Sequence, residues 1–250
     1  MTHKKVVLIT GASRGIGAAT ALLAAKQGWA VAVNYLVNSL AADEVVRQIR
    51  AAGGTAMTIQ ADVAIEADVM RMFQAVDAKL GRISGMVNNA GVVDMPSRVD
   101  AMSVERLERM WATNITSSFV CAREAVKRMS TKHGGSGGSI VNLSSAAAKL
   151  GSPGQYVDYA ASKAAIDTFT IGLAKEVAME GIRVNAVRPG IIDTDIHASG
   201  GLPDRAAQVA PMVPMQRAGT AHEVAEAIVW LLSDDSSYST GSFIDVTGGR

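Results

Sequence analysis

Short runs of β-branched residues alternate along the chain with longer amphipathic or alanine-rich stretches. This alternation is typical of repeated βαβ units around a buried parallel sheet, with a helical segment between successive strands. The pattern therefore predicts an α/β fold. Seven strands are expected, over Val6 to Thr10, Ala30 to Tyr35, Ala56 to Ala61, Ile83 to Asn88, Ser139 to Leu143, Ile182 to Val187 and Phe243 to Val246.

Two further segments stand out in the same pattern. The longest helix is expected to begin at Ser103, a favourable N-cap, and to end near Lys132, although Arg106 stands where a capping box would have an acid. From Ile191 to Gln216, glycines and prolines interrupt the periodicity and leave one short helix. Long irregular insertions of this kind often serve as lids, so we expect this segment to determine substrate identity.

Composition narrows the class of protein. The 250 residues suit one domain over 1–250, and 48% hydrophobic but only 4% aromatic residues are typical of a tightly packed α/β core. A net charge of +1 with mixed signs removes the electrostatic argument for nucleic acid or an anionic membrane surface. The single cysteine, Cys121, excludes an intramolecular disulfide and a multi-thiolate metal cluster. With no signal peptide or membrane-spanning stretch recognised, small-molecule partners and a cytoplasmic location are expected.

A glycine-rich turn follows the first strand and reads Thr10-Gly11-Ala12-Ser13-Arg14-Gly15-Ile16-Gly17. Glycines allow a tight turn and a close approach of the backbone to a pyrophosphate, whose charge is received by the start of the following helix. The spacing differs from the usual dinucleotide motif, because three residues separate Gly11 from Gly15. An ordinary βα turn is the alternative, but the position between the first strand and a helix favours a dinucleotide site.

The end of the second strand bears on the choice of cofactor. Asn34 stands where an acid would bind a ribose 2′-hydroxyl and repel a 2′-phosphate. Because Asn34 is neutral, Arg14 is a nearby cation, and Asn38 and Ser39 offer hydrogen-bond donors, the sequence favours NADP over NAD. Use of both cofactors stays open.

The ends of the next two strands are expected to complete the nucleotide site. Asp62 and Val63 are placed to reach the adenine, and the alternative for Asp62 is a helix N-cap before the helix expected over Ala64 to Leu80. Asn88-Asn89-Ala90-Gly91 closes the fourth strand with small and amide side chains, as is needed where a backbone passes close to a ribose. A plain turn is the alternative there.

The most informative residues are Tyr159 and Lys163, which are four positions apart on a predicted helix and share one face. A nearby ammonium favours the phenolate, and lowering a tyrosine pKa from ~10 to about 7 requires about 4 kcal/mol of differential stabilisation. Tyr156 lacks a lysine at the corresponding position, so a role in the pocket wall or in packing is expected for it. Ser144 and Ser145 end the fifth strand at the ligand edge of the sheet; neighbours face opposite sides, and we expect Ser145 to face the substrate.

Taken together, the glycine turn, Asn88 to Gly91, Asn114, Ser145 and Tyr159-x-x-x-Lys163 resemble the short-chain dehydrogenase/reductase family over nearly the whole chain. Arg188-Pro189-Gly190 after the sixth strand is similar to the family's turn on the nicotinamide side. The resemblance implies a single-domain, Rossmann-like, doubly wound seven-stranded parallel sheet with helices on both faces. It also implies a homotetramer. The small side chains of Ala160, Ala161, Ala164 and Ala165 on the catalytic helix would suit close helix packing across a two-fold axis.

The resemblance assigns roles as well. Tyr159 would be the general acid or base, Lys163 would lower its pKa and bind the nicotinamide ribose, Ser145 would hold the substrate oxygen, and Asn114 would fix a water in the proton relay. No metal is implied. The expected cofactor contacts are Gly11, Ser13, Arg14, Gly15, Ile16, Gly17, Asn34, Asp62, Val63, Asn89, Ala90, Gly91, Tyr159, Lys163, Pro189, Gly190, Ile192 and Thr194.

The sequence therefore predicts an NADP(H)-preferring carbonyl reductase or alcohol dehydrogenase. It resembles both 3-oxoacyl carrier-protein reductases and glucose-type dehydrogenases, and the residues leave that choice open. A carrier protein would need a basic docking patch near the pocket, for which Arg123, Lys127 and Arg128 are the candidates. The alternative from another class, a non-catalytic NADP(H)-binding regulator, predicts a degraded catalytic set, whereas every member is present here.

Overall fold

The computed structural model describes residues 5–196 and 200–250, and its centre is the expected seven-stranded sheet. All neighbouring strands are parallel, in the order β3-β2-β1-β4-β5-β6-β9, so the α/β prediction is confirmed. The strand bounds are β1 (Val6–Ile9), β2 (Ala30–Tyr35), β3 (Ala56–Gln60), β4 (Gly85–Asn88), β5 (Gly138–Leu143), β6 (Ile182–Pro189) and β9 (Phe243–Val246).

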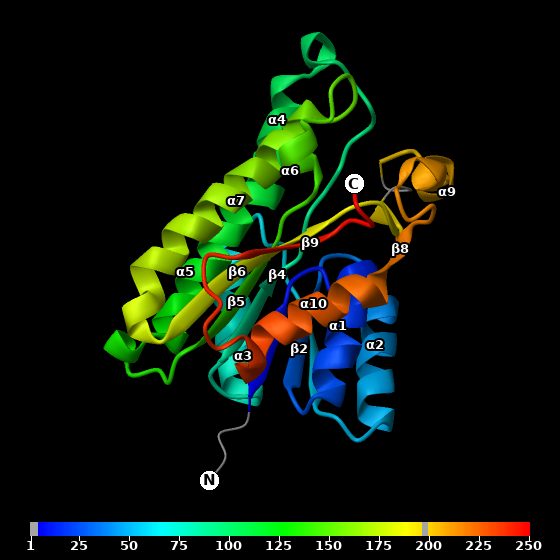
Figure 1. Ribbon diagram of the computed structural model, residues 1–250. Coiled ribbons are helices and arrows are strands. Elements are labelled where there is room, and N and C mark those ends of the chain that lie inside the picture. The colour runs from blue at the N-terminus through cyan, green and yellow to red at the C-terminus, as the bar shows by residue number, and fades with distance from the viewer. Residues whose placement is uncertain (1–4, 197–199) are drawn as a thin grey trace.

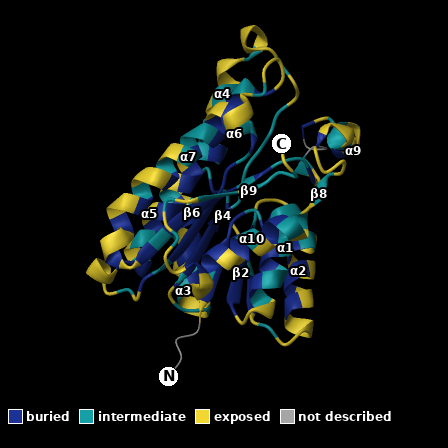
Figure 2. Ribbon diagram, viewed as in Figure 1, coloured by how far each residue is buried: buried dark blue, intermediate teal, exposed yellow. Residues whose placement is uncertain are grey.

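Helices cover the sheet on both faces (Figure 1). Residues on β1 alternate between the two layers: Val7 and Ile9 pack in the core under α1, α2 and α10, while Val6 and Leu8 pack with α3, α5 and α7. The sheet is consequently buried between two apolar layers, as Figure 2 shows. The helices are α1 (Gly15–Lys26), α2 (Ser39–Ala51), α3 (Glu66–Lys79), α4 (Val104–Trp111), α5 (Ser117–Met129), α6 (Ala147–Leu150), α7 (Val157–Val177), α9 (Arg205–Val209) and α10 (Ala221–Leu232).

The long helix expected from Ser103 forms as α4, a π-helical turn over Ala112–Thr116, and α5 in unbroken succession. The Ser103 side chain accepts a hydrogen bond from the Arg106 N–H at 3.2 Å, so the cap forms without a capping-box acid. The helix ends at Met129, because Ser130 turns to an extended conformation with ψ of 132°. Lys132, the expected end, lies beyond it in a 3₁₀ turn.

The irregular segment from Ile191 to Gln216 contains α9 as its short helix, and residues 197–199 within it lie outside the described residues. Its first residues form β7 (Ile192–Asp193), which pairs in parallel with β8 (Gly219–Thr220) just after the segment. This small second sheet was not expected, since a two-residue strand has no periodicity of its own. It ties the start of the segment to the N-cap of α10, where Thr220 and Glu223 form a capping box.

A chain of buried amides and hydroxyls joins the sheet to α7. Asn88 of β4 donates through Nδ2 to Oδ1 of Asn142 on β5 at 2.8 Å, and Asn142 donates to the Thr170 hydroxyl of α7 at 2.9 Å. All three residues are buried. Because buried polar groups are costly without partners, this chain specifies the position of α7 against the two central strands.

We predict that Asn142→Leu lowers the free energy of unfolding by about 2–4 kcal/mol, because it leaves the buried Asn88 amide without its acceptor and Thr170 without its donor. Chemical denaturation of the purified protein measures this loss. Gln48→Leu is the control, since Gln48 is exposed on α2, and a change within about 0.5 kcal/mol is expected there. Equal effects of the two substitutions would contradict the importance of the buried chain.

Candidate active site

The site lies where the strand order reverses. After β1 the chain builds β2 and β3 on one side of β1 and then crosses to β4 on the other, so the loops after β1 and β4 diverge. In parallel α/β sheets, ligands bind in the crevice at the carboxyl ends of the strands beside such a switch point. Here the glycine turn, the Asn88–Gly91 turn and the end of β5 meet at this edge.

The glycine turn depends on glycine at particular positions. Gly11 and Gly15 have φ of +60° and +54°, which disfavour other residues. At Gly17 an added Cβ would lie 2.6 Å from Nδ2 of Asn89 and 2.6 Å from the Gly11 carbonyl oxygen. The Asn89 amide in turn donates to the carbonyls of Thr10 at 2.7 Å and Gly11 at 3.0 Å. Asn89, expected to contact the cofactor, thus also holds the turn in shape.

The N-terminus of α1 suits an anion. Arg14 is the N-cap residue in an extended conformation, without a side-chain cap, and the first turn contains no acid. The first N–H groups of a helix and its positive dipole end favour negative charge. The open turn and the close approach that the glycines permit therefore fit the pyrophosphate of a dinucleotide.

The placement of Asn34 departs from the expectation that it faces a ribose. Its side chain is buried; Oδ1 accepts from the Gly11 N–H at 3.1 Å, and Nδ2 donates to the carbonyls of Ala61 at 3.1 Å and Ile59 at 3.3 Å. Asn34 therefore connects β1, β2 and β3 and fixes the glycine turn from inside. A residue at a strand end can point either way, and only the register of the three strands decides which.

The turn after β3 is built around two acids. Oδ1 of Asp62 accepts from the Ala64 N–H at 2.9 Å, and the Asp62 N–H donates to Asp68 at 3.1 Å, which holds the pKa of the Asp68 carboxyl below its usual value. The N-cap of α3 is Ile65, so the alternative of Asp62 as the helix cap is wrong. The Val63 side chain is buried. Contacts of Asp62 and Val63 with adenine stay predictions.

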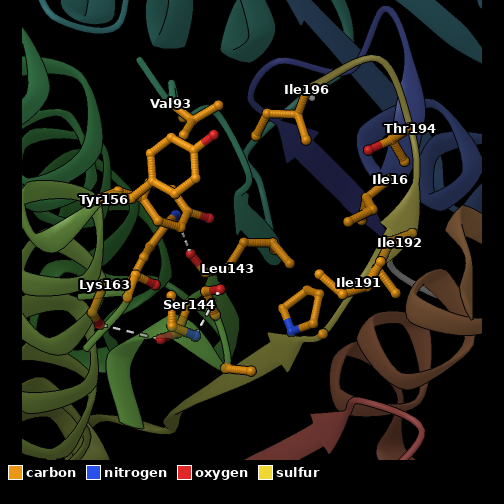
Figure 3. Close-up of a pocket in the computed structure, with 18 of the residues that line it drawn as sticks. Ile16, Val93, Leu143, Ser144, Tyr156, Lys163, Ile191, Ile192, Thr194 and Ile196 are labelled. Atoms are coloured by element: carbon orange, nitrogen blue, oxygen red, sulfur yellow. Dashed lines mark hydrogen bonds between the residues drawn. The ribbon is translucent and has the colours of Figure 1, made fainter. Parts of the chain in front are cut away.

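Tyr159 and Lys163 lie on the first turns of α7 and line one cavity together with Ser145 from the end of β5. The Lys163 ammonium donates to the Leu143 carbonyl at 2.7 Å and lies 5.6 Å from the centroid of the Tyr159 ring. Figure 3 shows Lys163 and Ser144 on one side of this cavity, opposite Ile191, Ile192 and Thr194.

The two neighbouring serines differ in their surroundings. The Ser144 hydroxyl is buried and donates to the main-chain carbonyl of Lys163 at 3.2 Å. Ser145 is partly exposed, accepts from the Ala147 N–H at 3.1 Å, and its side chain hydrogen-bonds with Tyr159. This placement favours Ser145 as the residue that meets the substrate oxygen.

Asn114 lies inside the π-helical turn and is buried. Its Oδ1 accepts from the Val92 N–H at 2.8 Å, and its Nδ2 donates to the Val92 carbonyl at 2.9 Å and the Ser162 hydroxyl at 3.1 Å. A Cβ on Gly91 would be 3.4 Å from Oδ1 of Asn114 and 3.5 Å from Nζ of Lys163. The amide therefore ties the loop after β4 to α7, close to the ammonium.

Burial dominates the titration of the catalytic pair. It raises the pKa of the Tyr159 phenol, against a lowering by the hydrogen bond with Ser145. It lowers the pKa of Lys163 to about 8, against the raising effect of the Asp167 charge. Lys163 is not among the causes of the shift in the phenol pKa, and the lowering of that pKa by the ammonium stays a prediction.

The cavity has a volume of about 180 Å³, enough for a small substrate group. Many of the expected site residues line it, namely Ile16, Asn89, Gly91, Ser145, Tyr159, Lys163, Pro189, Gly190, Ile192 and Thr194. The other expected residues do not: Gly11, Ser13, Arg14, Gly15, Gly17, Asn34, Asp62, Val63, Ala90 and Asn114. Most of these belong to the glycine turn and the strand ends beside it, where a nucleotide would extend away from the catalytic groups.

Sequence reasoning found the chemistry of the cavity but missed much of its wall. Tyr156 is 6% exposed and lines the cavity, as expected. Ile191, Ile196 and Arg205 of the wall belong to the irregular segment that was expected to determine substrate identity, whereas Val93, Leu143, Leu150 and Arg250 were not anticipated. These wall residues come from β5, α6, α9 and loops far apart in the sequence, so no single local spacing relates them to Tyr159 and Lys163.

The proposed basic docking patch is not formed near the cavity. Arg123, Lys127 and Arg128 all pair with Glu124 on α5, and Arg123 and Arg128 also pair with acids of α3. None of the three lines the cavity. Their charges are neutralised locally, so they offer no free positive surface at the entrance.

Within residues 5–196 and 200–250, no cluster of three or more His, Cys, Asp or Glu side chains could hold a metal ion. The single cysteine, Cys121, is buried, and burial raises the pKa of its thiol to about 12. In the same described part of the chain, no helix combines the length and apolar character needed to cross a bilayer.

Comparisons with known proteins agree with this architecture. A family model described as enoyl-(acyl carrier protein) reductase matches residues 11–250. The uncharacterized oxidoreductase YgfF of Escherichia coli K12 is 58% identical and covers 98% of this chain and 99% of its own. A 3-oxoacyl-acyl-carrier-protein reductase of Synechocystis is 40% identical over 98% of this chain and 96% of its own. A solved short-chain type dehydrogenase/reductase from Mycobacterium marinum has a TM-score of 0.91 at 37% identity, covering 98% of this chain and 94% of its own.

The inward placement of Asn34 gives a test. We predict that Asn34→Asp lowers the free energy of unfolding by about 2 kcal/mol or more at pH 8, because a carboxylate would face the carbonyls that Nδ2 now meets. The pKa of this buried acid would be raised in the folded state, so the loss should shrink as the pH falls toward ~4.

The measurement is chemical denaturation at both pH values. Asn38→Asp is the matched control, since Asn38 caps α2 through its side-chain oxygen and aspartate caps equally well. A stable Asn34→Asp protein with changed cofactor preference would contradict the structural role.

Proposed function

The chain belongs to the short-chain dehydrogenase/reductase family, and we propose that it is an NAD(P)-dependent oxidoreductase acting between a carbonyl and an alcohol. The observation that supports this most is the meeting of Tyr159, Lys163 and Ser145 in one cavity beside the glycine turn. A proton donor, a cation and a hydroxyl gathered next to a dinucleotide site suit hydride transfer coupled to proton transfer.

We propose NADP(H) as the preferred cofactor. Asn34 no longer supports this preference, but residues 35–39 after β2 contain no acid that would repel a 2′-phosphate. Arg14 at the start of α1 adds positive charge on the same side. The N-terminus of α1 would hold the pyrophosphate, and Lys163 would hold the nicotinamide ribose.

The chain's own residues supply the proton chemistry. When bound, the dihydronicotinamide supplies the hydride to the substrate carbon. Ser145 donates a hydrogen bond to the substrate oxygen, and Tyr159 gives its phenol proton to that oxygen as negative charge develops. The raised pKa of the buried phenol keeps Tyr159 protonated at neutral pH, which suits the reduction direction.

Reprotonation of Tyr159 is assigned to Lys163 and Asn114. The Asn114 amide N–H groups already donate to Val92 and Ser162. We therefore assign the expected contact with a water to the main-chain carbonyl of Asn114. Nζ of Lys163 and Oδ1 of Asn114 both lie close to Gly91, and we propose that the ammonium links the phenol to this water. The ammonium carries the proton onward and holds the phenolate between steps.

We propose a cytoplasmic homotetramer. On α7, Ala161 is exposed and Ala164 and Ala165 are partly exposed, which leaves a shallow face where another helix can approach closely. Beside it, Phe119 of α5 is 47% exposed and stacks on Phe169 with ring centroids 3.8 Å apart. An apolar face of this kind suits burial against a second copy.

The pKa of Lys163 predicts the pH dependence of cofactor binding. As the pH rises through about 8 the ammonium loses its proton, so we expect NADPH affinity to be flat below that value and to fall by up to about tenfold per unit above it. Fluorescence titration of the binary complex measures this. Lys163→Met should bind weakly without the decline; a decline that persists in this variant would assign it to another group.

The proton-donor role is tested by Tyr159→Phe. We expect kcat for carbonyl reduction to fall by about a thousandfold, because the variant has no acid at the substrate oxygen. The NADPH Kd should stay within about threefold, since the ring remains in place. Tyr156→Phe is the matched control and should retain most activity; a Tyr159→Phe enzyme with more than about a tenth of the activity would refute the mechanism.

A further inference from the structure

Among the described residues, the charged side chains that line the active-site cavity are all positive. Among its lining residues, Lys163, Arg205 and Arg250 carry cationic side chains, and neither Asp nor Glu occurs. Lys163 has its role in proton transfer. Arg205 and Arg250 come from opposite ends of the C-terminal region, and the proposed hydride transfer gives them no function.

Arg205 is held in place by neutral groups. Its Nη2 donates to Oε1 of Gln155 at 2.8 Å, and its guanidinium carbon lies 5.0 Å from the centroid of the Tyr156 ring. In the described part of the chain no carboxylate pairs with it, and Gln155 is its only hydrogen-bond acceptor. A guanidinium has five N–H donors, so most of its capacity is available to a ligand.

The contrast with neighbouring arginines is clear. Arg106 forms a two-point pair with Asp158 beside the same end of α7, and Arg188 pairs with Asp167 further along it. Both are partly buried and neutralised by acids of this chain. Arg205 lies against the cavity without such a partner, and placing a cation there is favourable when a ligand supplies the counter-charge.

The position of Arg205 separates it from the nucleotide. Gln155 and Tyr156, which Arg205 contacts, immediately precede α7, and Tyr156 lines the cavity on the same side as Val93 (Figure 3). The pyrophosphate is proposed to bind at the N-terminus of α1, to which these contacts of Arg205 do not extend. An anion on Arg205 would therefore belong to the substrate.

The other residues of the cavity wall indicate the chemical character of the rest of the substrate. Much of the wall of the cavity that contains Arg205 and the catalytic groups is apolar, formed by Val93, Leu143, Leu150, Ile191 and Ile196. Such a surface favours hydrocarbon over a polyhydroxylated chain. A sugar would leave its hydroxyls without partners on this wall.

We propose that the substrate is a carbonyl compound bearing an anionic group, such as an oxo acid, whose charge binds Arg205 above Tyr156 while its hydrocarbon segment packs on the apolar wall. This proposal rests on the proposed reductase function and specifies its substrate class. Carboxylate and phosphate both match a guanidinium fork, so the anion is defined by charge and geometry.

The test compares anionic carbonyl compounds with uncharged compounds of closely similar structure. NADPH-dependent reduction is measured for oxohexanoates with the carbonyl at successive carbons and for their methyl esters, and for dihydroxyacetone phosphate beside dihydroxyacetone. The wild-type enzyme should prefer one acid over its ester. Arg205→Met should raise KM for that acid by about 10- to 100-fold and change KM for the ester less than about threefold.

Two controls separate binding from folding and from net charge. Arg205→Lys should recover part of the preference, and Arg98→Met, which removes an exposed arginine paired with Asp100 outside the cavity, should leave it unchanged. Hexanoate should inhibit reduction of a neutral ketone more strongly than hexanamide, and Arg205→Met should abolish this difference. This inhibition does not depend on turnover of the acid.

The outcomes are distinct. Preference for dihydroxyacetone phosphate over dihydroxyacetone, lost in Arg205→Met, would identify a phosphate as the anion. Equal reduction of acids and esters, or equal losses for both in Arg205→Met, would overturn the substrate class while leaving the reductase function intact. Absence of turnover across the whole neutral and anionic panel, with NADPH still bound, would overturn the proposed function and this inference together.

Discussion

The hydrogen bond from the Lys163 ammonium to the Leu143 carbonyl connects the catalytic helix to the sheet, and the site depends on it. It fixes the first turns of α7 against the end of β5. The Ser144 hydroxyl returns a hydrogen bond to the Lys163 carbonyl, so the two elements are joined at one level in both directions. Ser145, two residues beyond the end of β5, is thereby brought to hydrogen-bonding contact with Tyr159. One register between helix and strand thus places the cation, the phenol and the hydroxyl together.

This arrangement carries an energetic tension. Burial favours the neutral phenol of Tyr159 and also the neutral amine of Lys163, whose pKa falls to about 8. Asp167, one turn further along α7, opposes the second effect with its negative charge and is itself held by Arg188 at 2.9 Å. Arg188 lies over the Phe243 ring at 3.8 Å, so the edge of the sheet supports the charge balance of the site. The protonation state of Lys163 is therefore a property of the packed layers as much as of the local helix.

Features that follow local periodicity could be predicted from the sequence. Features that depend on the direction in which a side chain points could not. Continuous apolar runs predicted the strands, and a four-residue spacing predicted that Tyr159 and Lys163 share a face. The same spacing did not tell which atom the ammonium meets, and the ammonium donates to the Leu143 main-chain carbonyl. Asn34 was placed correctly at a strand end but points inward, because the β1–β2–β3 register sets its direction. Arg205 reaches the cavity through folding of an irregular segment, which no spacing encodes.

The proposed function gives the crevice two kinds of anion site, and their difference would explain how one cavity can serve two ligands. At α1 the positive charge comes from main-chain N–H groups that the glycine turn leaves open, a shape that any strand–turn–helix unit with these glycines reproduces. At Tyr156 it comes from one side chain, held by an amide and an aromatic ring that precede α7. A main-chain site is hard to alter without breaking the fold, whereas a side-chain site changes with one substitution. On this proposal, cofactor recognition is built into the sheet and its first turn and substrate recognition into the irregular segment above it, where replacing the charge of Arg205 is expected to leave the Tyr159–Lys163 pair in place.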